Sequence, residues 1–267
     1  MKVGYLGPKG TFSSEACNNY CKGNEEKIEY KTIVDTILAL ENDKIDVAIV
    51  PIENSLQGCV TDAIDTLIKF ENINVIGEVL LDIKQNLMAN KKCNLEEIKE
   101  IYSHPQAIAQ CRNYLEKNFK SAKVIPVEST SYAAKKVSEK EELCACIGNL
   151  ECAKVYNINL IEKNIQDNEF NQTKFWILRK KENSNTTPNK MCMIFSVKDK
   201  PGALYNVLKI FNEYSLNLTK IESRPAKTVF GEYYFWIDVS INKNCDEDKA
   251  IEEIRKSGIY VRVLGKY

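Results

Sequence analysis

The chain has 267 residues, 44% of them hydrophobic, and its 37 Lys and Arg residues balance 37 Asp and Glu residues. This apolar fraction is enough for a folded core and excludes a disordered chain. The zero net charge argues against a nucleic-acid-binding protein, which usually carries a basic excess. The first residues resemble no secretory signal, and no run of 18 apolar residues predicts a membrane span. We therefore expect a cytoplasmic protein with no membrane partner.

The first 178 residues alternate between two kinds of apolar pattern. Strands are predicted for segments 2–6, 46–52, 75–83, 122–129, 144–148 and 170–178. Helices are predicted for segments 14–21, 35–42, 61–70, 105–118 and 130–140. Such alternation is typical of an α/β protein with a mainly parallel sheet.

Residues 179–190 (RKKENSNTTPNK) are polar and charged and lack apolar periodicity, which is typical of a linker. After them, the predicted elements are a strand at 191–197, a helix at 201–215, strands at 218–225 and 232–241, a helix at 247–258 and a strand at 259–265. The order β-α-β-β-α-β is the ferredoxin-like split pattern. We expect a linker at 183–190 and a second domain at 191–267.

Ten cysteines and one histidine, His104, are the candidate soft metal ligands. The cysteines form no CxxC pair, and only Cys144 and Cys146 are close in sequence. In a reducing compartment such scattered thiols remain free. A metal site is therefore not expected, and no thiol has the histidine partner that nucleophilic catalysis requires.

Hydroxyl or amide residues stand at the predicted starts of several helices, directly after strands. These segments are 11–13, 54–55, 103–106 and 129–131. A helix start offers free N–H groups and the positive end of the helix dipole, and such ends gather at the carboxyl edge of an open sheet. One such residue alone is more often a simple N-cap. Together they favour a site for carboxylates.

Two titratable residues lie beside these segments. Glu53 follows a buried strand and is a candidate general acid, although a carboxylate in that position more often caps a helix or pairs with lysine. His104 precedes Pro105 at a helix start, a position that suits a capping or packing residue at least as well as a proton carrier.

Segment 156–178, YNINLIEKNIQDNEFNQTKFWIL, closely resembles the signature of the prephenate dehydratase family. The matching positions are Tyr156, Ile158, Ile161, Asp167, Thr173, Phe175 and Leu178. The blocks GPKGTFS, PIENSLQG, SHPQA and STSYAA resemble the family in its order, LTKIESRP (218–225) matches its second signature, and PGAL (201–204) resembles its amino-acid-binding turn. One departure is Lys174, because the family has Thr-Arg-Phe where this chain has Thr-Lys-Phe.

The resemblance implies decarboxylative dehydration of prephenate to phenylpyruvate, water and carbon dioxide in L-phenylalanine biosynthesis, without cofactor or metal. It assigns catalysis to Thr173, which would donate a hydrogen bond or a proton to the leaving hydroxyl. Without the signature, Thr173 would be read as a packing residue of a strand. The predicted substrate-binding residues are Thr11, Asn54, Ser55, Ser129, Thr130, Lys174 and Phe175. Lys174 would supply a point charge where arginine supplies a planar fork.

The resemblance also implies a two-lobed α/β catalytic domain at 1–182, similar to type II periplasmic binding proteins. The lobes would be roughly 1–76 with 168–182, and 77–167, with the site between them and closure excluding water. The C-terminal domain resembles ACT modules, which implies feedback inhibition by phenylalanine and a homodimer or homotetramer paired through these domains. The predicted phenylalanine-binding residues are Gly202, Ala203, Leu204, Glu222, Ser223 and Arg224.

The sequence leaves two alternatives open. An arogenate dehydratase would perform the same chemistry on a substrate with an amino group in place of the side-chain ketone. A non-catalytic amino-acid-binding regulator is the second alternative, because Lys174 replaces the family arginine. A solute-binding protein is disfavoured, because the chain shows no export signal.

Overall fold

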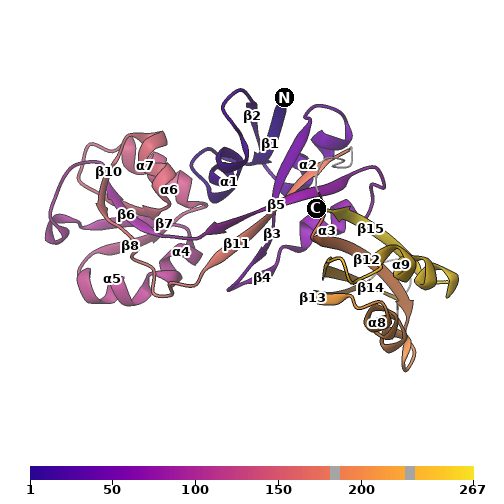
Figure 1. The fold of residues 1–267 in the computed structure, drawn as a ribbon. Helices are drawn as coiled ribbons and strands as arrows, with labels where there is room; N and C mark the ends of the chain where they lie inside the picture. The colour runs from indigo at the N-terminus through magenta and orange to yellow at the C-terminus, as the bar shows by residue number, and fades with distance from the viewer. Residues whose placement is uncertain (181–186, 226–231) are drawn as a thin grey trace. The chain divides into compact units, whose positions relative to one another are not determined.

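The computed structural model describes residues 1–180, 187–225 and 232–267. It divides into two compact units, one of residues 1–71 and 78–177 and the other of residues 72–77 and 178–267. Figure 1 follows the chain from its first strand to its last. Residues 183–186 of the predicted linker lie outside the described residues.

The first lobe is built on a sheet with the strand order β2-β1-β3-β11-β5, although residues 74–77 of β5 and 178–179 of β11 are grouped with the second unit. The strands are β1 (Lys2–Leu6), β2 (Glu26–Tyr30), β3 (Val47–Asn54), β5 (Asn74–Asp82) and β11 (Gln172–Arg179), with β4 (Gly58–Cys59) paired to β3. Its helices are α1 (Phe12–Tyr20), α2 (Ile33–Glu41) and α3 (Thr61–Leu67). β1 runs parallel to both β2 and β3, as the alternation of strands and helices predicts.

The second lobe has its own sheet, in the order β10-β6-β9-β7-β8. The strands are β6 (Asn86–Ala89), β7 (Glu100–Ser103), β8 (Lys123–Pro126), β9 (Ala145–Gly148) and β10 (Asn159–Glu162). Its helices are η1 (Leu95–Glu97), α4 (Pro105–Gln110), α5 (Arg112–Asn118), α6 (Thr130–Ser138) and α7 (Leu150–Tyr156). β7 is parallel to β8 and β9, whereas β6 is antiparallel to both of its neighbours, so this sheet is mixed.

The predicted helix at 105–118 is wrong as a single element, because it breaks at Cys111 into α4 and α5. The carbonyl of Gln110 accepts a hydrogen bond from the backbone of Asp167 at 2.7 Å. The Asp167 carboxylate then accepts from the backbone N–H of Asn113 at 3.1 Å. A distant segment thus takes the place of the next helical turn, which no local pattern could indicate.

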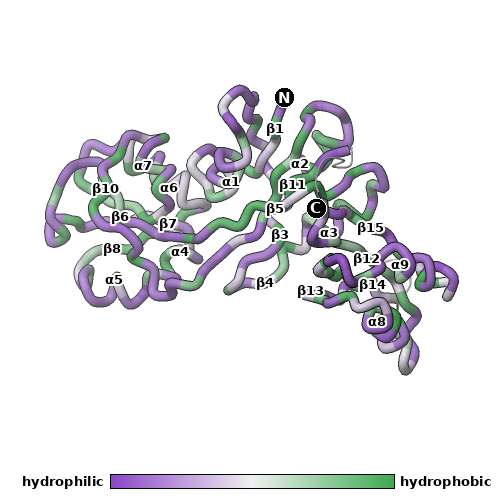
Figure 2. The backbone as a smooth tube through the Cα atoms, in the orientation of Figure 1, coloured by the Kyte–Doolittle hydropathy of each residue, from purple (hydrophilic) through white to green (hydrophobic). Residues whose placement is uncertain are grey.

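Buried apolar residues hold each lobe together. In β3 the run from Val47 to Val50 is fully buried, as is expected for a central strand covered on both faces. In α2, Ile33, Ile37 and Leu40 recur at helical spacing and are buried, while Thr32 caps the first turn. Figure 2 shows the apolar colour concentrated along the strands of both lobes.

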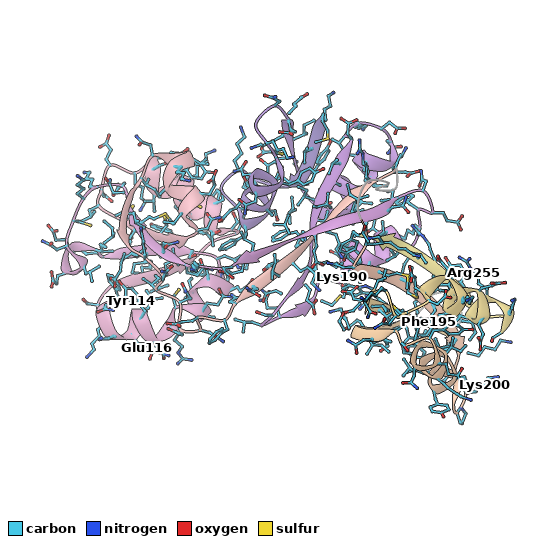
Figure 3. All side chains as sticks on the ribbon, in the orientation of Figure 1. Tyr114, Glu116, Lys190, Phe195, Lys200 and Arg255 are labelled. Carbon is cyan, nitrogen blue, oxygen red and sulfur yellow. The ribbon has the colours of Figure 1, made fainter. Side chains whose placement is uncertain are left out.

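The second unit is a four-stranded antiparallel sheet in the order β13-β14-β12-β15. Its elements are β12 (Lys190–Lys198), α8 (Ala203–Glu213), β13 (Asn217–Pro225), β14 (Glu232–Ser240), α9 (Glu247–Lys256) and β15 (Tyr260–Lys266). Alternate residues of β12, including Met193 and Phe195, pack with Phe211 of α8 and Ile254 of α9. Figure 3 labels Phe195 inside this layer. The order β-α-β-β-α-β confirms the predicted ferredoxin-like pattern.

The opposite face of this sheet is buried as well. Trp236 is fully buried and its indole N–H lies 3.1 Å from the sulfur of Cys192. Arg262, on β15, donates a hydrogen bond of 2.9 Å to the carbonyl of Ile73, in segment 72–77 of the same unit. That segment therefore belongs with the C-terminal sheet, although it lies far from it in sequence. Among the described residues, no helix is long and apolar enough to cross a membrane.

Candidate active site

A cavity of about 330 Å³ lies within the first unit and is lined by residues of both lobes. Of the predicted site residues, it brings together Thr11, Asn54, Ser129, Thr130, Thr173 and Phe175. Residues that the sequence did not assign to substrate also line it, among them Gln85, His104, Gln106, Gln110 and Glu128. The cavity therefore gathers polar side chains from segments more than 100 residues apart.

Two of the helices that begin at this cavity, one from each lobe, are capped by a side-chain hydroxyl. Thr11 caps α1 and accepts a hydrogen bond from the backbone N–H of Ser14 at 3.2 Å. Ser129 caps α6 in the same way and accepts from the backbone N–H of Tyr132 at 2.9 Å. Since the cap hydroxyls are occupied, the first free N–H groups of each helix and the positive dipole ends are what the helices offer an anion. The cavity is therefore suited to carboxylates.

Thr173 lies on β11, and its hydroxyl oxygen accepts a hydrogen bond from the amide nitrogen of Asn54 at 2.9 Å. Asn54 is buried at the end of β3, a neighbour of β11 in the sheet. Its side-chain oxygen accepts from the backbone N–H groups of Leu56 and Gln57 at 3.0 and 3.1 Å. Asn54 thus joins the turn after β3 to Thr173, and its amide is engaged within the protein.

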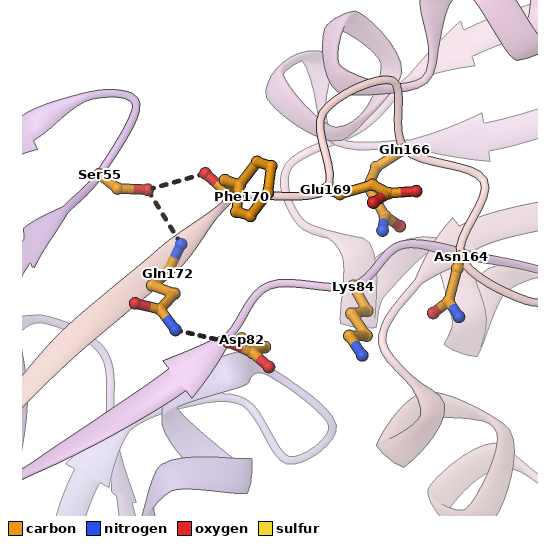
Figure 4. Close-up of a pocket in the computed structure, with 8 residues that line it drawn as sticks. All are labelled: Ser55, Asp82, Lys84, Asn164, Gln166, Glu169, Phe170 and Gln172. Atoms are coloured by element: carbon orange, nitrogen blue, oxygen red, sulfur yellow. Dashed lines mark hydrogen bonds between the residues drawn. The ribbon is translucent and has the colours of Figure 1, made fainter.

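Lys174 and Ser55 do not line this cavity. Lys174 follows Thr173 on the strand, where side chains alternate between faces, and its ammonium nitrogen lies 3.2 Å from the carboxylate of Glu53. Ser55 lines a second cavity of about 540 Å³ and accepts a hydrogen bond from the backbone of Gln172 at 2.9 Å (Figure 4). Glu53 therefore has the lysine partner that the sequence suggested as its ordinary role.

His104 is a helix cap beside the cavity, and its role as a proton carrier stays a prediction. Its Nδ1 accepts a hydrogen bond from the backbone N–H of Gln106 at 3.3 Å, so it caps α4, and its ring also lines the cavity. Among the described residues, no group of three or more His, Cys, Asp or Glu side chains is arranged to hold a metal ion.

The two lobes are joined beside the cavity by contacts with the loop before α1. The hydroxyl of Ser131 donates to the carbonyl of Lys9 and lies 2.8 Å from the hydroxyl of Tyr156. The thiol of Cys152 lies 3.0 Å from the carbonyl of Gly10. Gly10 has a φ of +84°, a conformation that favours glycine. This loop therefore fixes the distance between the starts of α1 and α6.

Comparison with known proteins places this geometry in a family. Residues 3–183 match the family described as prephenate dehydratase, and residues 193–256 match the ACT domain. The chain belongs to the prephenate dehydratase family. A prephenate dehydratase of Lactococcus lactis subsp. cremoris is 41% identical over 100% of this chain and 97% of the relative. The family and the C-terminal ACT domain that the signatures predicted are thereby confirmed.

Solved structures of the same family agree with this assignment. The prephenate dehydratase of Staphylococcus aureus subsp. aureus Mu50 superposes with a TM-score of 0.86 at 30% identity, covering 100% of both chains. The prephenate dehydratase of Arthrobacter aurescens, in complex with L-Phe, superposes with a TM-score of 0.88 at 29% identity, over 100% of this chain and 90% of that one. The predicted α/β fold with an ACT domain is therefore confirmed.

In the ACT domain of this family member, the predicted effector residues occupy two elements. Gly202 precedes α8 with a φ of +80°, and Ala203 and Leu204 form the first turn of the helix. Glu222, Ser223 and Arg224 lie near the end of β13, an outer strand of the sheet. Backbone N–H groups are thus available at the start of α8, where a positive φ requires a glycine.

Proposed function

We propose that this chain converts prephenate to phenylpyruvate, water and carbon dioxide, with Thr173 acting on the leaving hydroxyl. The observation that carries the proposal is the Asn54–Thr173 hydrogen bond inside the cavity at which α1 and α6 begin. Membership of the prephenate dehydratase family supports the substrate and the reaction.

The reaction requires little from the protein beyond positioning the substrate. The bond between the ring and its carboxylate breaks, and its electron pair moves into the ring as the carbon–oxygen bond at the opposite position breaks. The departing oxygen takes one proton, which the solvent ultimately supplies, and leaves as water while the ring becomes aromatic. The driving force therefore lies in the substrate, and the protein must hold two carboxylates and assist one hydroxyl.

Thr173 is suited to assist that hydroxyl. Because Asn54 donates to its oxygen, the hydroxyl hydrogen of Thr173 is free to be donated to another acceptor. A hydroxyl that accepts one hydrogen bond becomes a stronger donor. Thr173 as a residue is only 9% exposed, and electrostatic interactions are stronger in such a buried environment than in water. We assign it the hydrogen bond to the oxygen that departs.

The substrate carboxylates are assigned to the starts of α1 and α6. Thr11 and Ser129 fix those helix ends as caps, and Thr130 and the backbone N–H groups that follow would contact the anion. Phe175 lies two residues after Thr173 on β11 and therefore on the same face, where it forms an apolar part of the cavity wall. Substrate binding by Ser55 and Lys174 stays a prediction, since both lie outside this cavity.

Phenylalanine is the proposed inhibitor, bound at residues 202–204 and 222–224 of the ACT domain. The related enzyme from Arthrobacter aurescens was solved with L-Phe, which supports this effector. Inhibition requires that phenylalanine bind two states of the protein with different affinity. We further propose a cytoplasmic homodimer or homotetramer paired through its ACT domains.

The proposal is tested by following phenylpyruvate formation from prephenate and from arogenate, with and without phenylalanine. We expect turnover of prephenate that phenylalanine suppresses. Thr173→Val keeps the shape of the side chain without its hydroxyl and should lower kcat by roughly 10²–10⁴-fold, whereas Thr173→Ser should keep most activity. Turnover of arogenate alone would favour the arogenate dehydratase, and none on either substrate would favour the regulator.

A further inference from the structure

Gln85 is a buried amide in the wall of the active-site cavity. It lies in the segment that joins β5 to β6, where the chain passes from the first lobe to the second, and it is 3% exposed. It lines the same cavity as Thr173. Neither the family signature nor the pattern of helix starts marks it.

The backbone and one end of the side chain are held firmly. The N–H of Gln85 donates to the side-chain oxygen of Gln166 at 2.9 Å, and its carbonyl accepts from the backbone N–H of Ile165 at 2.8 Å. The side-chain Nε2 donates to the side-chain oxygen of Gln110 at 3.0 Å. Three bonds to two other segments therefore fix the direction in which the remaining atom, Oε1, points.

Oε1 of Gln85 has no hydrogen-bond partner in the described part of the chain, although it is fully buried. Buried polar atoms are almost always paired, because an unpaired one loses its bonds to water without replacement. Gln85 lines the cavity, and its Oε1 is a rigidly held acceptor that the described part of the chain leaves unsatisfied, so a ligand's hydrogen-bond donor at this wall would supply the missing bond.

We propose that Oε1 of Gln85 accepts a hydrogen bond from the ring hydroxyl of prephenate. This inference rests on the proposed function, because it takes its donor from that substrate. At neutral pH the two carboxylates and the ketone of prephenate can only accept hydrogen bonds, so the ring hydroxyl is the one donor it offers. The pairing therefore identifies which end of the substrate faces Gln85.

Gln85 and Thr173 then have complementary tasks at one oxygen. Thr173 donates to the hydroxyl oxygen, and Gln85 accepts from its hydrogen. As the oxygen departs as water it gains a second O–H bond and becomes a stronger donor. An acceptor already in place stabilises this developing water more than it stabilises the bound substrate, so the contact accelerates the reaction.

The test compares substrate with product. Gln85→Met keeps the length of the side chain without its amide, and it should lower kcat/KM for prephenate roughly tenfold to a hundredfold. Phenylpyruvate has lost the ring hydroxyl, so its inhibition constant should stay within about twofold of wild type. An equal loss of affinity for phenylpyruvate would show a structural role and overturn the proposal, as would unchanged turnover in a folded Gln85→Met protein.

A second variant separates an acceptor from a donor. Neutral histidine offers an unprotonated ring nitrogen, whereas the imidazolium only donates. Gln85→His should therefore be active above about pH 7 and lose activity as the pH falls below about 6.5, with wild type and the uncatalysed reaction measured at each pH. Activity that rises on protonation would mean that position 85 serves a substrate carboxylate, which would contradict the proposal.

Failure of this inference is distinguishable from failure of the proposed function. Wild-type protein that does not turn over prephenate would contradict the proposed function itself. Wild-type turnover together with full activity of both variants would leave that function intact and remove Gln85 from it.

Discussion

The amide nitrogen of Asn54 lies 2.9 Å from the hydroxyl oxygen of Thr173 and 2.8 Å from the side-chain oxygen of Asn171. One buried amide therefore connects the end of β3 to Asn171, directly before β11, and to Thr173 within that strand. Its oxygen meanwhile closes the turn at Leu56 and Gln57. The donor half of this side chain serves the proposed catalytic residue, and the acceptor half serves the fold.

Replacing Asn54 by aspartate separates these two halves. Asn54→Asp keeps the acceptor for the turn but removes the donor to Thr173, and its second oxygen can capture the hydroxyl hydrogen that we assign to the substrate. We expect kcat to fall at least about tenfold while KM changes little, since the lost interaction acts in the transition state. Steady-state kinetics on prephenate measure both constants.

Asn54→Ala is the matched comparison. It loses the turn as well as the donor, so it should be less stable than Asn54→Asp by about 1–3 kcal/mol in urea unfolding. If Asn54→Asp kept the wild-type kcat, Asn54 would not position Thr173.

Local sequence patterns predicted many of the elements and the helix starts in the site, but not β2, α7 or β10. Thr11 and Ser129 are caps because a hydroxyl before an amphipathic segment satisfies free N–H groups of that same segment. Thr173 was found through a family signature, since a threonine in a strand otherwise indicates packing. Local patterns predict contacts between residues that are separated by about one helical turn in the sequence.

The features that were missed depend on distant partners. The break at Cys111 is made by Asp167, the side chain of Gln85 is held by Gln110, and Lys174 lies beside Glu53 rather than in the cavity. Each pair is separated by 25 residues or more, and its partner is defined only by the folded sheets. No periodicity or spacing in one segment carries that information.

Variants of Lys174 distinguish two roles for its side chain, which are binding the substrate and stabilising the strand. Its side chain is 19% exposed and that of Glu53 is 30% exposed, so removing one charge leaves the other partly buried. We expect Lys174→Met to lower the free energy of unfolding by about 1 kcal/mol with KM for prephenate nearly unchanged. Lys174→Arg should preserve both quantities.

The double variant Lys174→Met with Glu53→Gln supplies the control. If the pair is structural, removing both charges should restore part of the stability lost in Lys174→Met. A rise in KM of more than about tenfold in Lys174→Met would instead support the carboxylate-binding role that the sequence suggested.

Buried thiols predict how stability depends on alkaline pH. Burial raises the pKa of Cys17, Cys111 and Cys152 to about 12. In the unfolded chain these thiols ionise near pH 9, so between about pH 9 and 12 the unfolded state binds fewer protons than the folded state. Stability should be fully present below about pH 9 and decrease as the pH rises toward 12, by up to about 1.4 kcal/mol per pH unit for each thiol.

Urea unfolding at several pH values between 7.5 and about 11 measures this slope. Cys111→Ala should reduce the slope because one ionising group is gone. Val137→Ala, which also shortens a fully buried side chain, should lower stability equally at every pH. Equal slopes in wild type and Cys111→Ala would show that this thiol does not contribute.

The contacts of Arg262 lead to a prediction about how phenylalanine binding at the ACT domain affects the active site. Its side chain is buried on β15 and donates to the carbonyl of Ile73, and a Cβ atom added at Gly265 would lie 1.9 Å from the carbonyl oxygen of Val75. Segment 72–77 is thus held tightly against the C-terminal sheet. The chain continues from it through β5 directly to Gln85 in the active-site wall.

We expect Arg262→Met to weaken inhibition by phenylalanine at least about fivefold while phenylalanine still binds, because the anchored segment loses a buried contact that only the ACT sheet provides. Inhibition kinetics on prephenate measure the coupling, and calorimetry measures binding separately. Arg255→Met, which removes an exposed arginine of α9 in the same unit, should change neither (Figure 3). Unaltered inhibition in Arg262→Met would mean that the signal does not pass through segment 72–77, and loss of phenylalanine binding would mean that Arg262 supports the effector site itself.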